Sequence, residues 1–357
     1  MFSKTLNVAV AALAASSMVS AQTFTSCDPT KKSCPADPAF GKNSVNCDFT
    51  KGKCSAFHDL DGTSTKYNDK GAVFSIEKVS NAPTAATKNY IFFGRVDIEI
   101  QAAAGNGIVT SAVLQSDDLD EIDWEWVGGD SSHVQSNYFS KGDTTTYDRG
   151  GTHPVSNALT SFHTYSVEWT KDAVNWIIDG TTVRTLTAAA AGAKFPQTPM
   201  QVKIGTWCAG GPDSPPGTRD WAGGLTDFSK APFNAYYKSI KIVDYAGGSS
   251  VASNDVKSYS YGDKTGSWGS IKVEGGKNDD SSSSSSKDSS STSAPKSTGA
   301  SKTGMQTSNS AAATNTDGAS TTGSKPTTSP TKVPDNAAGR NSAALALIVG
   351  SIAALFL

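Results

Sequence analysis

The chain has 357 residues, a formal net charge of −2 and hydrophobic side chains at 37% of its positions. So balanced a charge argues against nucleic acid as a partner, because phosphate binding needs a concentrated basic surface. We therefore expect an uncharged ligand, bound by one domain with a sizeable core.

The first 21 residues are typical of a secretory signal. Lys4 supplies the positive end, residues 6–15 form an apolar run too short to span a membrane, and Val19-Ser20-Ala21 is a small-residue cleavage site. The mature protein is predicted to begin at Gln22.

Four cysteines follow close behind, at Cys27, Cys34, Cys47 and Cys54. They form two pairs of identical spacing, which in a secreted chain is typical of local disulfides. Of the three possible connectivities we prefer Cys27 with Cys34 and Cys47 with Cys54. Zinc is the alternative, but the spacings are longer than in a Cys-x-x-Cys knuckle and the compartment is oxidising, so we expect no metal. A fifth cysteine, Cys208, is expected to be a small buried hydrophobe rather than a nucleophile.

From about Phe57 to Tyr245, short apolar stretches are separated by Gly, Asn, Asp and Pro. Alternation with almost no helical periodicity indicates an all-β sandwich or barrel. An Ala-rich stretch at 187–193 is expected to form only a short turn. The expected strands are 72–76, 90–100, 108–114, 120–127, 165–169, 174–178, 200–204 and 236–243.

One of these strands carries an acid at every second position, at Glu121, Asp123 and Glu125. Because side chains of a strand alternate between faces, the three acids share one face while apolar residues share the other. A solvated strand is the ordinary explanation, but such a face usually mixes signs, since like charges side by side are destabilising. No Lys or Arg interrupts this run. We therefore predict an active site built on carboxyl groups.

The stretch Glu121-Ile122-Asp123-Trp124-Glu125 resembles the Glu-x-Asp-x-Glu signature of glycoside hydrolase family sixteen. Four further blocks follow in the family's order, at 134–138, 162–180, 206–211 and 219–224. The resemblance implies a β-jelly-roll sandwich of two curved antiparallel sheets, whose concave face holds a substrate cleft.

The resemblance also implies roles for single residues. In a retaining mechanism Glu121 would be the nucleophile, Glu125 the acid/base and Asp123 the assisting residue between them. The ordinary alternatives for three of the substrate-binding candidates are a core position for Trp207, a surface ion pair for Arg95 and a packing role for Tyr90. Sugar rings would stack on Trp207 and Trp221, and sugar hydroxyls would bind Gln135, Asn137, Arg95 and Tyr90.

The composition changes along the last part of the chain. Residues 22–275 are expected to form the catalytic domain, and 276–336 a disordered, O-glycosylated Ser/Thr-rich stalk with too few apolar residues to fold. Residues 337–357 end in an apolar run that is typical of a removed glycosylphosphatidylinositol signal, with attachment expected at Asn336 or a neighbour of it. A tail anchor is the alternative, but the run is marginal for spanning a bilayer core of about 30 Å.

Together with the tryptophans of the acidic strand, these features are similar to the fungal Crh-type branch of the family. That branch implies a transglycosylase of the cell wall that takes chitin as donor and β-1,3/β-1,6-glucan as acceptor. We expect no cofactor, a monomer, and membrane contact only through the lipid anchor. An endo-β-glucanase with the same acids is the main alternative. A lectin would not need the acids, and a structural wall glycoprotein would not explain the ordered motifs.

Overall fold

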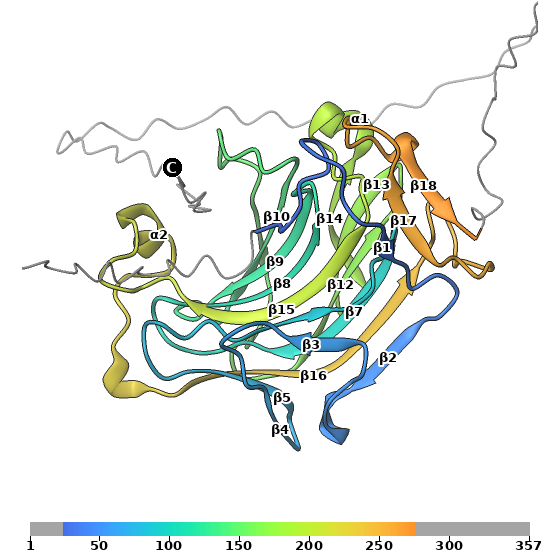
Figure 1. Cartoon of the computed structure of the whole chain (residues 1–357). Coiled ribbons are helices and arrows are strands. Elements are labelled where there is room, and N and C mark those ends of the chain that lie inside the picture. Colours follow the sequence, from blue (N-terminus) through green and yellow to red (C-terminus); the bar gives the residue numbers. More distant parts are fainter. Residues whose placement is uncertain (1–23, 276–357) are drawn as a thin grey trace, which may run out of the picture. The chain divides into compact units, whose positions relative to one another are not determined.

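Two curved antiparallel sheets lie face to face (Figure 1) in a computed structural model that describes residues 24–275. This confirms the predicted all-β sandwich. The expected secretory signal, the stalk and the lipid-anchor segment with Asn336 lie outside the described residues. No helix in the described range is long and apolar enough to span a membrane.

The first sheet has seven strands, with the acidic strand β9 near its middle. The adjacent strands β8 and β10, and β15 on the far side of β8, bend along the same arc (Figure 1). In spatial order the strands are β11 (Gly151–Pro154), β10 (His133–Phe139), β9 (Glu121–Val127), β8 (Ile108–Ser116), β15 (Met200–Cys208), β6 (Thr84–Thr87) and β3 (Phe57–Asp59).

The second sheet packs against the first and includes the long strand β16, which is paired on both sides. A short strand, β2 (Val45–Asp48), also pairs with β16. In spatial order the sheet contains β14 (Thr181–Thr187), β13 (Ala173–Ile178), β12 (His163–Trp169), β7 (Gly94–Gln101), β16 (Phe233–Asp244), β5 (Gly71–Ile76) and β4 (Lys66–Asn68).

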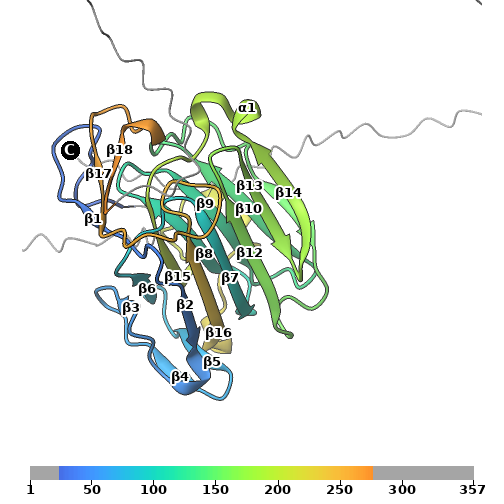
Figure 2. The ribbon, with the colours of Figure 1, turned by 90° about the vertical axis from the view of Figure 1, so that its right-hand side faces the viewer.

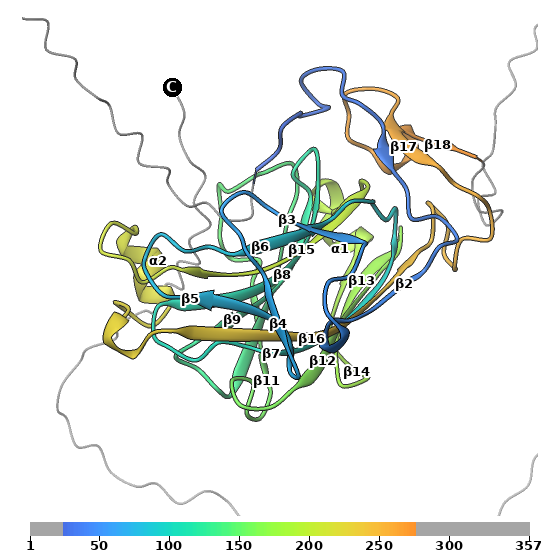
Figure 3. The same cartoon turned by 60° about the horizontal axis from the view of Figure 1, so that its bottom comes forward.

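A small third sheet joins the two ends of the described chain: β1 (Asp37–Pro38), β17 (Ser258–Tyr261) and β18 (Ile271–Glu274). Its strands lie together at one end of the sandwich (Figures 2 and 3). The buried carboxylate of Asp244 attaches this sheet to the core, since it accepts hydrogen bonds from the Tyr259 hydroxyl and from the backbone N–H groups of Gly41 and Phe92.

Helices are few and short in the described range. The Ala-rich stretch forms one α-helical turn followed by a 3-10 turn, close to the expected short turn. The stretch expected to be a strand from residue 90 enters regular pairing only at Gly94, the start of β7. The helical elements are α1 (Ala188–Ala191), α2 (Pro216–Trp221), η1 (Phe49–Lys51), η2 (Gly192–Lys194), η3 (Phe228–Lys230) and η4 (Trp268–Ser270).

The core lies between the two large sheets, and the apolar face of β9 is part of it. Ile122, Trp124 and Trp126 are all buried. The indole N–H of Trp124 donates to the backbone carbonyl of Ser166 at 3.2 Å, and that of Trp176 donates to the carbonyl of Asp123 at 3.0 Å. These bonds tie β9 to the second sheet, so the opposite, acidic face of β9 is held on the outside of the sandwich.

Both predicted disulfides are present: Cys27 pairs with Cys34 and Cys47 with Cys54. Cys208 is free and half-buried, with its thiol 3.4 Å from the Thr226 hydroxyl, and burial raises its pKa.

Candidate active site

The three acids of β9 lie on the concave face of the first sheet, opposite the core-facing tryptophans. Glu121 is 6% exposed, Asp123 is 2% exposed and Glu125 is half-buried. Strand alternation brings them to one face, and the buried side chains of the other face fix the register of the strand.

The neighbouring strands add polar side chains to the same face. On β10, Gln135 lies opposite Glu125 and Asn137 lies opposite Asp123. On β8, Gln115 lies opposite Glu121. The structure therefore brings the predicted residues Gln135 and Asn137 to the acidic strand.

The three acids have different electrostatic surroundings. Burial, followed by the charges of Glu121 and Glu125, raises the pKa of Asp123 far above its ordinary value, and the protonated Asp123 hydrogen-bonds Glu121. Burial and the charge of Glu121 raise the pKa of Glu125 to about 8. Glu121 instead accepts a hydrogen bond from the Gln115 amide, at 2.7 Å from Nε2 to Oε2.

This division suits acid-base chemistry. A carboxyl group protonated near neutral pH can donate a proton, while a neighbouring carboxylate that accepts hydrogen bonds can act as nucleophile. Glu125 fits the first role and Glu121 the second. Asp123, whose pKa is raised by burial and by the charges of Glu121 and Glu125, lies between them and hydrogen-bonds Glu121.

The two predicted tryptophans lie together beside this face. The rings of Trp207, on β15, and Trp221, at the end of α2, stack with centroids 6.2 Å apart, and both are half-buried. The Trp221 indole N–H donates to Gln135 Oε1 at 2.9 Å. The stacked pair of rings is thus connected to β10 through Gln135, the residue that lies opposite Glu125.

Arg95 does not join the site. Its neighbours Val96 and Ile98 on β7 are in the core, so Arg95 projects from the outer face of the second sheet. There it pairs with Asp97 at 2.9 Å and Glu168 at 3.4 Å. The prediction that Arg95 binds sugar is corrected, because both sheets separate it from the acids; the alternative of a surface ion pair describes it.

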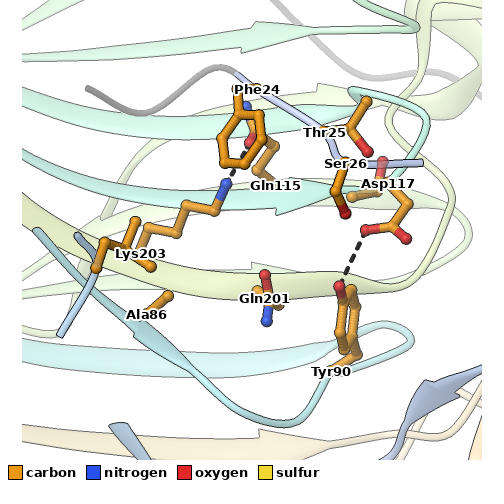
Figure 4. Close-up of a pocket in the computed structure, with 11 residues that line it drawn as sticks. Phe24, Thr25, Ser26, Ala86, Tyr90, Gln115, Asp117, Gln201 and Lys203 are labelled. Atoms are coloured by element: carbon orange, nitrogen blue, oxygen red, sulfur yellow. Dashed lines mark hydrogen bonds between the residues drawn. The ribbon is translucent and has the colours of Figure 1, made fainter. Parts of the chain in front are cut away.

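Tyr90 lies in a pocket beside the acids rather than among them. Its hydroxyl donates to Asp117 at 2.9 Å (Figure 4), and Gln115 and Lys203 line the same pocket. Its contact with substrate remains a prediction.

Sequence reasoning did not identify Gln115 or Lys203. Lys203 alternates with the apolar Val202 and Ile204, which signals a polar face, whereas Gln115 comes directly after the expected strand 108–114. What the sequence does not show is that β8 and β15, far apart in the chain, are neighbours in the sheet.

Comparison with known proteins identifies the family of the chain. Residues 54–223 match the model of glycosyl hydrolases family 16. The Crh-like protein 4 of Aspergillus fumigatus is 49% identical over 272 residues, which cover 76% of this chain and 58% of that relative. The Crh-like protein 1 of the same species is 48% identical over 266 residues, 74% of this chain and 70% of the relative.

A solved structure of a Crh5 transglycosylase in complex with NAG is 46% identical, with a TM-score of 0.65, and the match covers 70% of this chain and all of that one. The chain spans 58% and 64% of the length of the first two curated relatives that it matches. With its jelly-roll sandwich and its alternating acids, the chain belongs to glycosyl hydrolases family 16 and, within that family, to the Crh-like proteins.

Proposed function

We propose that the chain is a retaining transglycosylase that cleaves chitin and transfers the released chain to β-1,3/β-1,6-glucan in the fungal cell wall, with weak hydrolysis of chitin as a side reaction. The single observation that carries this proposal is the arrangement of Glu121 and Glu125 on one face of β9, where Glu121 accepts a hydrogen bond from the Gln115 amide and the charge of Glu121, with burial, raises the pKa of Glu125 to about 8. The name of the solved Crh5 transglycosylase, and its complex with NAG, support transfer and an N-acetylglucosamine-containing donor.

The chemistry takes two steps. In the first, the Glu121 carboxylate attacks the anomeric carbon while Glu125 gives its proton to the leaving glycosidic oxygen, so one C–O bond forms as another breaks. In the second, Glu125, now a carboxylate, removes the proton from an acceptor hydroxyl, which attacks the glycosyl-enzyme and releases Glu121. Water in place of the sugar hydroxyl would give hydrolysis.

Asp123 assists without bonding to the substrate. Because its pKa is raised, it is neutral at the pH where the other two acids work, and it can donate a hydrogen bond to Glu121. As Glu121 becomes an ester and then a carboxylate again, this hydrogen bond stabilises the charged state of the leaving carboxylate.

Two sequence features support a proposal for the location of the protein. We propose secretion after removal of residues 1–21, and attachment to the membrane through a glycosylphosphatidylinositol anchor near Asn336. The Ser/Thr-rich residues 276–336 would then hold residues 22–275 away from the membrane and within reach of wall polysaccharides.

The test is incubation of the purified protein with a chitin oligosaccharide and a fluorescent β-glucan oligosaccharide. A labelled product longer than the acceptor is expected. Glu121→Gln and Glu125→Gln should each abolish this product with the fold intact, because the amides have nearly the same shape but neither attack nor exchange a proton. Asp123→Asn should be less impaired, since the native side chain is already neutral.

Two outcomes would contradict the proposal. Consumption of chitin without a labelled hybrid product would show a hydrolase. Consumption of the glucan with the chitin oligosaccharide untouched would favour the endo-β-glucanase alternative.

A further inference from the structure

Lys203 is a charged side chain on the concave face to which the two-step chemistry gives no role. It projects from β15 and is only 6% exposed. Burying an ammonium group costs several kcal/mol unless it is paired. Phe24 and Gln115 lie beside it in the pocket (Figure 4), with the ammonium nitrogen 6.0 Å from the centre of the Phe24 ring.

Two hydrogen bonds connect Lys203 to Glu121. The Lys203 ammonium donates to Gln115 Oε1, and Gln115 Nε2 donates to Glu121 Oε2 at 2.7 Å. The register explains the contact: Gln115 lies opposite Glu121 on one side and opposite Gln201, two residues from Lys203, on the other. The three side chains therefore form a line across three adjacent strands.

The chemistry of these groups allows one arrangement. An ammonium group only donates hydrogen bonds and a carboxylate only accepts them, whereas an amide has one end of each kind. With Lys203 on one side and Glu121 on the other, only one orientation of the Gln115 amide satisfies both. Turned by 180°, the amide would place NH₂ against ammonium and C=O against carboxylate.

We propose that Lys203 is a positioning residue: it holds the Gln115 amide in the orientation that donates a hydrogen bond to Glu121, and so orients the attacking carboxylate. This inference rests on the proposed role of Glu121 as nucleophile. Lys203 touches no reacting atom in this scheme and acts through Gln115.

The charges around Lys203 are consistent with this role. Burial lowers the pKa of Lys203 to about 8, against the opposing effect of the carboxylates of Glu121 and Asp117. Tyr90 also faces this pocket, and burial keeps its hydroxyl protonated. Below pH about 8 the hydrogen-bonded series Lys203, Gln115 and Glu121 therefore begins with a cation and ends at the nucleophile.

The test is a titration of the Glu121 side-chain carboxyl by ¹³C NMR in the full chain made with labelled glutamate. Loss of a signal in Glu121→Gln assigns it. In Lys203→Met, which removes donor and charge at nearly constant volume, Glu121 should titrate about 1 pH unit higher than in the wild type. Gln115→Met should shift it upward as well.

The double variant distinguishes a relay, meaning an effect of Lys203 transmitted to Glu121 through Gln115, from a direct electrostatic effect of the Lys203 charge on Glu121. If Lys203 acts through Gln115, adding Lys203→Met to Gln115→Met should change the titration little, because coupled residues are not additive. Lys238→Met is the matched control, since it removes an ammonium that pairs with Glu99 on the second sheet, and it should leave Glu121 unmoved. Additive shifts, or an unshifted Glu121 in Lys203→Met, would overturn the proposal.

One measurement needs no variant and no activity. In the unmodified protein the side-chain NH₂ resonances of Gln115 should move as Lys203 titrates between pH 7 and 9, and resonances that stay fixed would overturn the proposal.

In an activity assay, the acidic limb of kcat/KM should shift upward in Lys203→Met by the same amount as the NMR titration. A wild-type protein that shows the relay by NMR but consumes no donor would contradict the proposed function and leave the relay standing.

Discussion

The carboxyl group of Glu125 keeps its proton at neutral pH because partial burial and the charge of Glu121 raise its pKa to about 8. We predict that kcat/KM falls as pH rises through about 8, where this general acid is lost. The pH profile of donor consumption measures it. A profile that stays level up to pH 10 would show that Glu125 is not the acid.

The same raised pKa has a consequence for stability. An acid whose folded pKa is above its unfolded value stabilises the fold most below the unfolded value, and this contribution is lost as pH rises toward the folded value. Glu125→Gln removes the loss, so the variant should unfold at a higher temperature than the wild type at pH 8. At pH 4 the difference should disappear. A variant that is less stable at both pH values would contradict this explanation.

Trp221 is the candidate for holding the acceptor, because its ring stacks with Trp207 and its N–H binds Gln135 opposite Glu125. Transfer must compete with water at about 55 M, and good positioning can be worth 10⁵ M or more. Trp221→Ala should therefore lower the ratio of transfer product to hydrolysis product more than it lowers donor consumption. Trp221→Phe, which keeps a ring but loses the hydrogen bond, is the control. An unchanged ratio with lower turnover would assign Trp221 to donor binding or packing.

Among the elements, β9 was the most predictable, since its alternation alone told which side chains face the core and which share the acidic face. The pairing of Cys47 with Cys54 was predictable for a similar reason, as short loops of equal length imply local bridges. The strands that lie next to β9 in the sheet were not predictable from the sequence. That Gln115 and Lys203 approach Glu121 depends on the order β9-β8-β15, which long-range packing decides. Arg95 was misplaced because the sequence does not tell which sheet a strand joins.

The two disulfides differ in their surroundings, so their removal should differ in effect. Cys47 is buried on β2, which pairs with β16, whereas Cys27 and Cys34 are not buried. Replacing Cys47 and Cys54 by serine should cost about 2–3 kcal/mol, the value for so short a loop. The same change at Cys27 and Cys34 should cost less, since no core packing is lost. If thermal unfolding shows the same loss of stability in both double variants, the two disulfide loops are equally attached to the core.

At the scale of the whole molecule, the third sheet completes the sandwich. Tyr259 is fully buried and binds Asp244, and Ile271 is also in the core. A chain that ends after residue 275 should therefore keep the stability and activity of residues 24–275, whereas one that ends after residue 247 should be strongly destabilised. Thermal unfolding of both measures this. A stable, active chain that ends at residue 247 would show that the third sheet is dispensable.

The central claim is that Glu121 forms a covalent glycosyl-enzyme, and trapping that intermediate tests it most directly. Glu125→Ala lacks the base of the second step, so a chitin oligosaccharide with an activated leaving group should load the variant and leave it slowly. Acid quenching, digestion and mass spectrometry locate the adduct. A sugar bound to the peptide that carries Glu121, and absent in Glu121→Gln, is the expected result. Turnover of the activated donor with inversion at the anomeric carbon, or an adduct on another residue, would contradict the claim.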